Sequence, residues 1–208
     1  QVRGSHPGIA VPELLADTAY YWRALAAAGY FEAVGFSEDD RKRTGFYKEN
    51  AKRLELRSST GTLDDYHRSL NMVASFAPFN AVGRARIAQL INKSNQFNLT
   101  TRRYTEEQVA RLDQDAGAFT LQVRLADIFG DNGMISVIIA HRDAEAWQID
   151  TWLMSCRVLG RRLEEAVLAE IARAARADGA SALVGRFIPT DRNMMVARHY
   201  EKLGFNRL

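Results

Sequence analysis

One short stretch of the chain, residues 150–162, combines a cysteine, three arginines and a glycine in the sequence Asp-Thr-Trp-Leu-Met-Ser-Cys-Arg-Val-Leu-Gly-Arg-Arg. It lies between an apolar run and an amphipathic one, where a strand is expected to turn into a helix. A phosphate or pyrophosphate would suit such a turn, which combines unpaired N–H groups at a helix N-terminus with a glycine and with arginines that have no acid among them. A solvated helix start that happens to be basic would look the same.

Cys156, the only cysteine, lies in this turn. A thiol beside Arg157 and near a helix N-terminus is favoured as the thiolate, which is the nucleophilic form. The alternative is a small buried apolar side chain at a strand end, which is the more common role of a lone cysteine. A single cysteine forms no disulfide within the chain, and this composition fits a reducing cytoplasm.

A second group of functional candidates lies between residues 81 and 104, where basic side chains occur without any acid. These side chains are Arg84, Arg86, Lys93, Arg102 and Arg103. An acidic partner protein or a phosphorylated ligand would suit them. Nucleic acid is disfavoured because only Phe97 and Tyr104 supply rings for stacking on bases. The alternative is a solvated helix face.

The whole chain has 208 residues, of which 47% are hydrophobic and 25% charged, with a formal net charge of +3. This length predicts one large domain, or one domain with an appendage. No apolar stretch approaches the roughly 20 residues of a membrane helix, so no membrane span is expected. The four histidines show no metal-ligand spacing, and no metal site is predicted.

Hydrophobic periodicity and capping residues predict that residues 1–70 are helical and that residues 71–208 follow the order βααβββαβα. The N-terminal helices are expected at 12–29, at 37–57 and after Thr62. The later strands are expected at 72–79, 119–126, 134–141, 147–154 and 181–188, and helices at 82–95, after Thr105, at 161–178 and at 191–202.

Short turns link the three central strands, which predicts an antiparallel meander, and a helical crossover then adds a parallel strand. The expected fold is therefore α/β (α+β), a mixed sheet flanked by helices. Strands that diverge at such a crossover favour a ligand site. On the last predicted helix, Asn193 and Tyr200 share a face, and Tyr200 either donates a proton or packs in the core.

Residues 150–162 and 193–205 resemble the acyl-CoA-binding and C-terminal motifs of the GCN5-related N-acetyltransferase (GNAT) fold, and the order of elements matches that fold. The first motif is usually Gln/Arg-x-x-Gly-x-Gly/Ala. Arg157 and Gly160 match it, whereas Arg162 stands where a small residue is expected.

A narrower resemblance, to the C-terminal half of FkbH-like proteins, covers essentially the whole chain. It rests on the blocks at 81–93, 95–103, 129–133 and 152–161. That family joins a haloacid dehalogenase (HAD) type phosphatase domain to a GNAT-like domain. The resemblance implies that residues 1–70 are the tail of that HAD-type domain and a linker, with any Mg²⁺ requirement confined to the missing domain.

For residues 71–208 the resemblance implies transfer of a glyceryl group to the phosphopantetheine thiol of an acyl carrier protein, in polyketide-type biosynthesis. Cys156 is then expected to hold the acyl group and Tyr200 to protonate a leaving thiolate. The arm of the carrier, or CoA, would meet the residues Arg157, Val158, Leu159, Gly160, Arg161 and Asn193. The carrier itself would dock on the basic side chains of residues 84–103.

Two alternatives remain open. The domain could be a non-catalytic GNAT-like module that only docks the carrier protein, or a CoA-dependent N-acetyltransferase, which Arg162 weakens. In each case a small acyl thioester or an acidic protein is the expected partner, and no tightly bound cofactor is expected in this chain.

Overall fold

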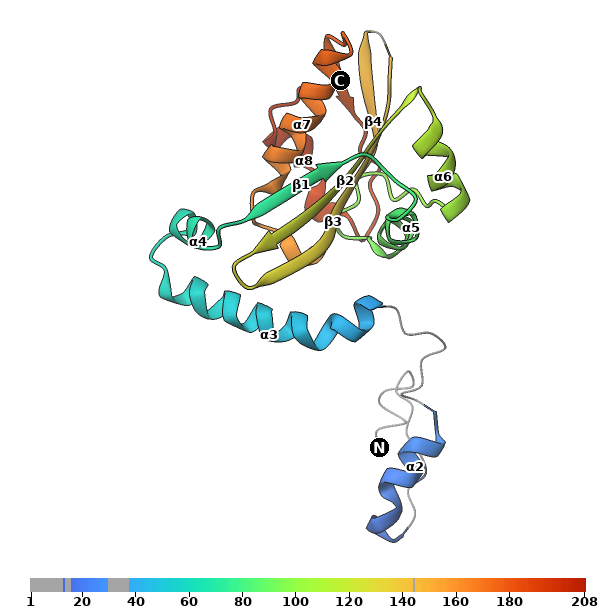
Figure 1. The fold of residues 1–208 in the computed structure, drawn as a ribbon, viewed down its shortest axis with the longest axis vertical. Coiled ribbons are helices and arrows are strands. Elements are labelled where there is room, and N and C mark those ends of the chain that lie inside the picture. Colours follow the sequence, from blue (N-terminus) through green and yellow to red (C-terminus); the bar gives the residue numbers. More distant parts are fainter. Residues whose placement is uncertain (1–12, 14–15, 30–37, 144) are drawn as a thin grey trace. The chain divides into compact units, whose positions relative to one another are not determined.

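The computed structural model describes residues 13, 16–29, 38–143 and 145–208, which are shown in Figure 1. The chain divides into two compact units, residues 1–47 and 48–208. In the first unit, η1 (Thr18–Tyr20) is capped by the side chain of Asp17 and leads into α2 (Tyr21–Ala27). Pro12 and Ser37, which were expected to begin the first two helices, lie outside the described residues.

Two further helices precede the sheet. The helix α3 (Glu38–Ser59) runs from the first unit into the second, and α4 (Leu63–Ser69) follows it. The predicted cap of α4 is confirmed, because Thr62 Oγ1 accepts a hydrogen bond from the Asp65 amide at 3.1 Å. Tyr66 and Leu70 are buried, so α4 belongs to the second unit's core.

Five strands among the described residues form one sheet in the order β1-β2-β3-β4-β5. Their bounds are β1 (Val73–Ala77), β2 (Ala118–Asp127), β3 (Gly130–His141), β4 (Ala146–Met154) and β5 (Ala182–Gly185). Neighbours from β1 to β4 are antiparallel, and β5 pairs with β4 in parallel. The predicted meander and mixed sheet are therefore confirmed.

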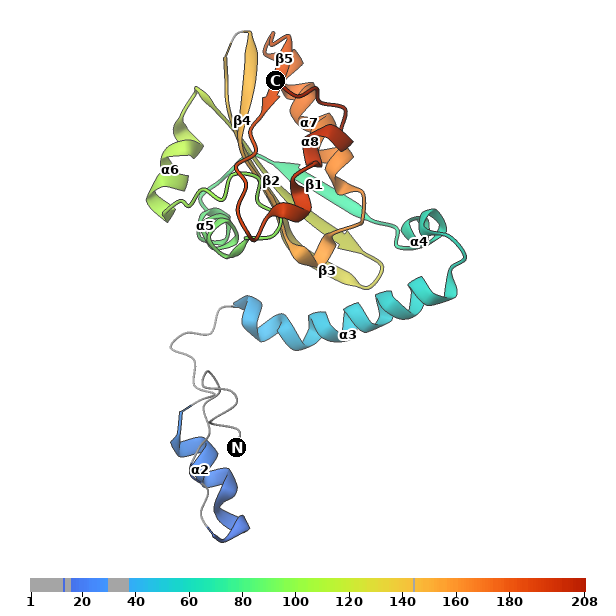
Figure 2. The ribbon, with the colours of Figure 1, turned by 180° about the vertical axis from the view of Figure 1, so that it is seen from behind.

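Helices cover both faces of this sheet, as Figures 1 and 2 show. On one face, α5 (Arg84–Lys93) and α6 (Glu106–Gln114) enclose a core that includes Ile87, Ile91 and Val109. On the other face, α7 (Leu163–Ala177) and α8 (His199–Lys202) pack over a larger core with Trp147 and Trp152. Among the described residues, none of the helices has the length and apolar content that a membrane crossing requires.

The prediction of one continuous helix over residues 191–202 is wrong. The chain instead forms η3 (Met194–Val196) and the short α8. The cause is Asn193, whose amide side chain closes a loop by accepting from the Thr190 amide at 2.7 Å and donating to the Ile188 carbonyl at 2.9 Å. Asn193 and Tyr200 therefore do not share the face of a single helix.

A buried carboxylate, Asp127, joins three separate parts of the second unit. Arg53 from α3 makes two hydrogen bonds of 2.8 Å to it, and Arg161 from the loop before α7 makes one of 2.9 Å. Asn132 and the Phe129 amide also donate to it. Burial by itself would raise the pKa of Asp127, but these hydrogen bonds outweigh burial and lower the pKa.

We predict that Asp127→Asn lowers the free energy of unfolding by about 3 kcal/mol, because it leaves the buried guanidinium group of Arg161 without its counter-charge and that of Arg53 with only Glu49, 3.6 Å away. A carboxylate with a lowered folded pKa stabilises the fold fully above its unfolded pKa of about 3.9, and this contribution is lost as the pH falls through the folded value. Urea unfolding from pH 2.5 to 7 should show a shallower acid dependence in the variant.

The matched control is Asp131→Asn in the same hairpin, because Asp131 pairs with Arg124 and both side chains are more than half exposed. It should change stability by less than about 1 kcal/mol. Equal stability losses in the two variants would contradict the structural role of Asp127.

Candidate active site at the end of strand β4

The candidate site is built around β4, whose edge partner changes halfway along the strand. Residues 146–149 of β4 pair with β5, and beyond them the two strands separate. The opening that the sequence predicts at this crossover is filled by the chain itself. The Leu99 amide donates to the Trp152 carbonyl and the Met154 amide to the Phe97 carbonyl, each at 3.0 Å.

This filling segment, residues 97–100, is buried along its whole length. On its far side the Ile188 amide donates to the Leu99 carbonyl at 2.8 Å, so the segment lies between β4 and the chain that follows β5. Asn193 Nδ2 donates to the Asn98 carbonyl at 2.9 Å, and Thr100 Oγ1 donates to the Asp150 carbonyl at 2.8 Å. The segment thus forms an isolated bridge to β4 between Asn98 and Leu153, and the side chains of Asn193 and Thr100 hold it in place.

A β-bulge marks the position where β4 leaves β5. Ile139 of β3 faces Thr151 and Ala140 faces Ile149, which leaves Asp150 as the extra residue of β4. Its buried carboxylate accepts from Tyr104 Oη at 3.0 Å and forms an ion pair of 2.8 Å with Arg102. Burial, together with the charge of Asp150, raises the pKa of Tyr104, so the phenol keeps its proton at neutral pH.

The turn after β4 carries the predicted nucleophile at the surface. Ser155 begins the single turn η2 (Cys156–Val158), in which Cys156 is exposed and Val158 is buried. Gly160 has a φ of +75° and Arg162 a φ of +58°, so the backbone makes two left-handed residues before α7 starts. The first N–H groups of α7 have no acceptor within their own helix, and they open onto this turn.

Helix α4 contacts the same turn. Nε2 of His67 lies 3.0 Å from the Gly160 carbonyl oxygen, a distance that fits an Nε2–H donor. Asp64 accepts from Arg162 at 3.3 Å, and Arg162 also reaches Glu165 in the first turn of α7. Helix α4 therefore helps to hold the turn that leads into α7.

The arginines of the turn have different surroundings. Arg161 points inward, is buried and is bound to Asp127, so it holds the turn to the β2–β3 hairpin. Arg162 is exposed and paired with acids. Arg157 lies closest to the cysteine, and its Nε donates to Ser155 Oγ at 3.4 Å.

Tyr200 is mostly buried and packs against aromatic rings rather than near the cysteine. Its ring centroid lies 6.2 Å from that of Trp152 and 5.5 Å from that of His199, and no described contact joins it to Cys156. Burial raises the pKa of Tyr200. Gly185 makes room for it, because a Cβ at that position would lie 2.3 Å from the Tyr200 ring.

Three polar atoms around Tyr200 have no hydrogen-bond partner among the described residues: Trp152 Nε1, His199 Nε2 and Tyr200 Oη. His199 packs edge-on against Trp152 and Phe97, at centroid distances of 4.6 and 5.0 Å. Burial, and then the positive charge of Lys202, lowers the pKa of His199 to about 4. The imidazole is therefore neutral at pH 7.

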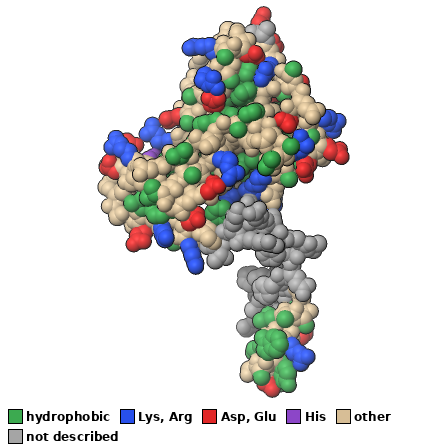
Figure 3. Space-filling view, viewed as in Figure 1, with side chains coloured by type: hydrophobic (Ala, Val, Ile, Leu, Met, Phe, Trp, Pro, Cys, Tyr) green, Lys and Arg blue, Asp and Glu red, His purple; other side chains and the backbone are tan. Residues whose placement is uncertain are grey.

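Most of the predicted basic docking residues are used within the protein. Arg84 pairs with Asp113, Arg102 with Asp150, and Arg103 donates to the carbonyl groups of Ile91 and Ser94 at the end of α5. Arg86 donates to Gln89. Lys93 is the exception, because its exposed side chain forms no ion pair or hydrogen bond with the described residues. On the face of the molecule in Figure 3, basic and acidic side chains are interspersed.

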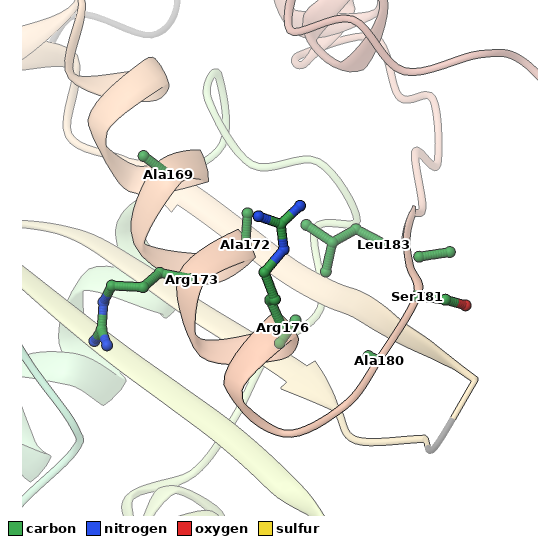
Figure 4. A pocket seen from close by; sticks show the side chains of 9 residues that line it. Ala169, Ala172, Arg173, Arg176, Ala180, Ser181 and Leu183 are labelled. Atoms are coloured by element: carbon green, nitrogen blue, oxygen red, sulfur yellow. The ribbon is translucent and has the colours of Figure 1, made fainter.

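A separate groove of about 460 Å³ lies between the second half of α7 and β5 (Figure 4). Its walls are mainly alanines, with Arg176 beside Leu183 and Arg173 directed away and paired with Glu170. It lies toward the opposite end of α7 from the Cys156 turn. Within the described residues, no cluster of His, Cys, Asp and Glu could hold a metal ion.

No protein-family model and no curated protein matches the sequence. Solved structures do match. An aminoglycoside 6′-N-acetyltransferase from Acinetobacter baumannii has a TM-score of 0.52 at 9% identity, over 65% of this chain and 92% of that one. A ribosomal-protein-alanine N-acetyltransferase from Brucella melitensis has a TM-score of 0.50 at 17% identity, over 65% and 93%.

AAC(6′)-Iy in complex with the bisubstrate analogue CoA-S-monomethyl-acetylneamine is also similar, with a TM-score of 0.51 at 11% identity over 65% of this chain and 92% of that one. These likenesses establish the fold, and the predicted GNAT-like architecture is confirmed. The fold implies CoA, but the residues here do not fit a pantetheine chain along the separated edge of β4, because residues 97–99 already satisfy its backbone groups.

Sequence reasoning missed Asp127, Asp150 and His199. A signal existed for Asp127, which interrupts the apolar run Leu-Ala-Asp-Ile-Phe, and for Asp150, which lies within a predicted strand. Acids at such positions are seldom buried unless they are paired. Their partners lie far away in sequence, so only the fold identifies them.

We predict that His199→Phe flattens the stability profile between pH 6.5 and 4. A histidine with a lowered folded pKa supports the fold fully above its unfolded pKa of about 6.5, and this support is lost as the pH falls to the folded value. The wild type should lose roughly 2 to 3 kcal/mol over this window, at about 1.4 kcal/mol per pKa unit.

Thermal or urea unfolding across the window would measure this loss, with His141→Gln, a change at an exposed histidine, as the control. An identical pH profile in the wild type and His199→Phe would show that His199 titrates normally.

Proposed function

We propose that residues 48–208 form an acyltransferase domain that holds an acyl group on Cys156 and passes it to the phosphopantetheine thiol of an acyl carrier protein. The observation that carries this proposal is the exposure of Cys156 at the end of a strand whose inner edge is closed. The likeness to N-acetyltransferases supports acyl transfer as the reaction class. The FkbH-like resemblance supports a glyceryl-type acyl group and the carrier protein.

Two exchange steps are required. In the first, the Cys156 thiolate attacks the carbonyl carbon of an activated acyl donor; a C–S bond forms, and the leaving group departs with its electron pair. In the second, the carrier thiolate attacks the new thioester and expels the Cys156 thiolate. Each step conserves the acyl group, and the thiol protons exchange with water.

The turn that follows Cys156 has a supporting role in this proposal. The N–H groups of Gly160 and of the first turn of α7 suit the phosphate of the carrier arm, since helix N-termini favour anions. Arg157, next to the nucleophile, would add a positive charge near that phosphate. Arg161 and Asn193 are not assigned to binding of the carrier arm. Arg161 is bound to Asp127, and the side chain of Asn193 makes its hydrogen bonds within the protein, to residues 188, 190 and 98.

Tyr200 is not assigned a part in the Cys156 steps. Its phenol lies beside Trp152, within the core, and no described contact links it to the turn. It would matter for a direct transfer on that side of β4, in which Cys156 takes no part.

A specific observation favours a second candidate, the non-catalytic docking module. The filling segment closes the place between β4 and β5 where an arm could lie along the sheet. The same closure counts against a CoA-dependent N-acetyltransferase, although one similar structure holds a CoA-containing analogue. The three candidate functions differ in which group becomes covalently attached and in which molecule receives it.

Intact-mass measurement on the 208-residue chain, incubated with the glyceryl thioester of N-acetylcysteamine, distinguishes these readings. We predict one acyl adduct on the wild type, its loss in Cys156→Ala, and a long-lived ester in Cys156→Ser. The adduct should be discharged by a carrier protein that bears its phosphopantetheine arm. Because Cys156 is exposed, unfolding of the alanine variant should match the wild type and serves as the control.

Transfer to the carrier at the wild-type rate by Cys156→Ala would contradict the covalent mechanism and favour direct transfer beside Tyr200. Carrier binding without any adduct would favour the docking module. Saturable acetyl-CoA binding with acetylation of an amine would favour the N-acetyltransferase.

A further inference from the structure

The C-terminal segment, residues 186–208, carries the entire net charge of the chain. It contains five Lys and Arg residues against two Asp and Glu residues, so its net charge is +3, equal to that of the 208 residues together. The remainder of the chain is balanced. In contrast to Arg84 and Arg102, which pair with Asp113 and Asp150, the side chains of Arg186, Arg192 and Lys202 form no ion pair with the described residues. Arg198 pairs with Glu201.

The same segment exposes apolar side chains. Met194 is 58% exposed, Met195 56% and Ile188 38%. Val196 is buried in the core and fixes η3, so the two methionines before it face solvent. Asn193 holds Ile188 beside the start of η3 through its 2.9 Å bond to the Ile188 carbonyl. All three apolar side chains are thus exposed on one short segment, residues 188–195, whose ends Asn193 links.

This surface is attached directly to the filling segment and to β4. Asn193, just before Met194, donates to the Asn98 carbonyl, and the neighbouring Phe97 carbonyl accepts from Met154, two residues before Cys156. In Figure 2 the chain after β5 runs over the sheet and turns back into α8. A partner seated on η3 would thus lie next to the end of β4 that carries the thiol.

We propose that Ile188, Met194 and Met195, with Arg186 and Arg192 beside them, form the docking surface for an acidic acyl carrier protein. The proposal rests on the proposed function. Exposed methionines adapt to an apolar side chain of a partner, and arginines are enriched in protein interfaces. Unpaired positive charge speeds association with an acidic protein and weakens as salt increases. Membrane and nucleic acid fit less well, because Asp191 and Glu201 interrupt the charge.

The test is titration of the 208-residue chain with a purified acyl carrier protein lacking its arm, so that binding is measured apart from chemistry. Arg186→Glu with Arg192→Glu should weaken binding at least tenfold, and Met194→Ala with Met195→Ala about fivefold. The matched controls are Arg111→Glu with Arg176→Glu, on exposed arginines of α6 and α7, and Val82→Ala, at a 95% exposed side chain. These should stay within twofold of the wild type.

Different results would overturn the docking surface and the proposed function. Discharge of the Cys156 adduct by free pantetheine needs no docking, so it should proceed at the wild-type rate in all of these variants. Loss of carrier binding in the surface variants without any adduct in the wild type would keep the surface and overturn the acyltransferase.

Unchanged carrier binding in the surface variants would overturn this docking surface. So would a loss of binding confined to Arg84→Glu, Arg86→Glu and Arg102→Glu, which would place the dock near α5. Binding of RNA or anionic vesicles, but not of the carrier, to the same residues would overturn the proposed partner.

Discussion

The backbone groups of β4 beyond Asp150 must find partners after β5 has separated from the strand. Buried N–H and C=O groups without partners are costly, and β4 runs through the centre of the core. The chain satisfies them internally: residues 97–99 pair with Trp152 and Met154 and are in turn paired with Ile188. The connection between α5 and α6, the loop after β5 and the position of Asn193 all follow from this constraint.

Because the edge of β4 is closed, the polar and titratable groups along the strand are mostly enclosed by the protein. A polar bulge at Asp150 remains, but its carboxylate is bound by Tyr104 and Arg102. On the other face, neutral His199 and the buried Tyr200 lie within an aromatic cluster. Beyond the end of the strand, the thiol of Cys156 is exposed. The turn that carries it is fixed on one side by Asp127 and on the other by α4. This arrangement, a turn bound on two sides with an accessible thiol, supports the covalent transfer proposed above.

Local features of the fold could be predicted from the sequence. Thr62 and Thr105 cap helices as their spacing indicates, and runs rich in apolar residues, separated by short turns, identify the strands of the meander. The features that were missed depend on distant partners. The filling segment pairs with β4 through residues 97–99, whose partners lie more than fifty residues later, and Asn193 gives no hint that it closes a loop. The sequence shows the positive charges at 84–103, but it does not show that acids such as Asp113 and Asp150 neutralise them in the fold.

The closure of β4 is most directly tested by amide hydrogen exchange at Leu99 and Met154, followed by NMR with and without saturating acetyl-CoA. These two amides make the bonds that close the edge, and Ile139 in β3 supplies the reference for a fully buried strand. If the edge is closed, exchange at Leu99 and Met154 is as slow as at Ile139 and is unchanged by acetyl-CoA. Fast exchange at both positions, or a loss of protection when acetyl-CoA is added, would show that the segment leaves β4 to admit a donor and would contradict the account.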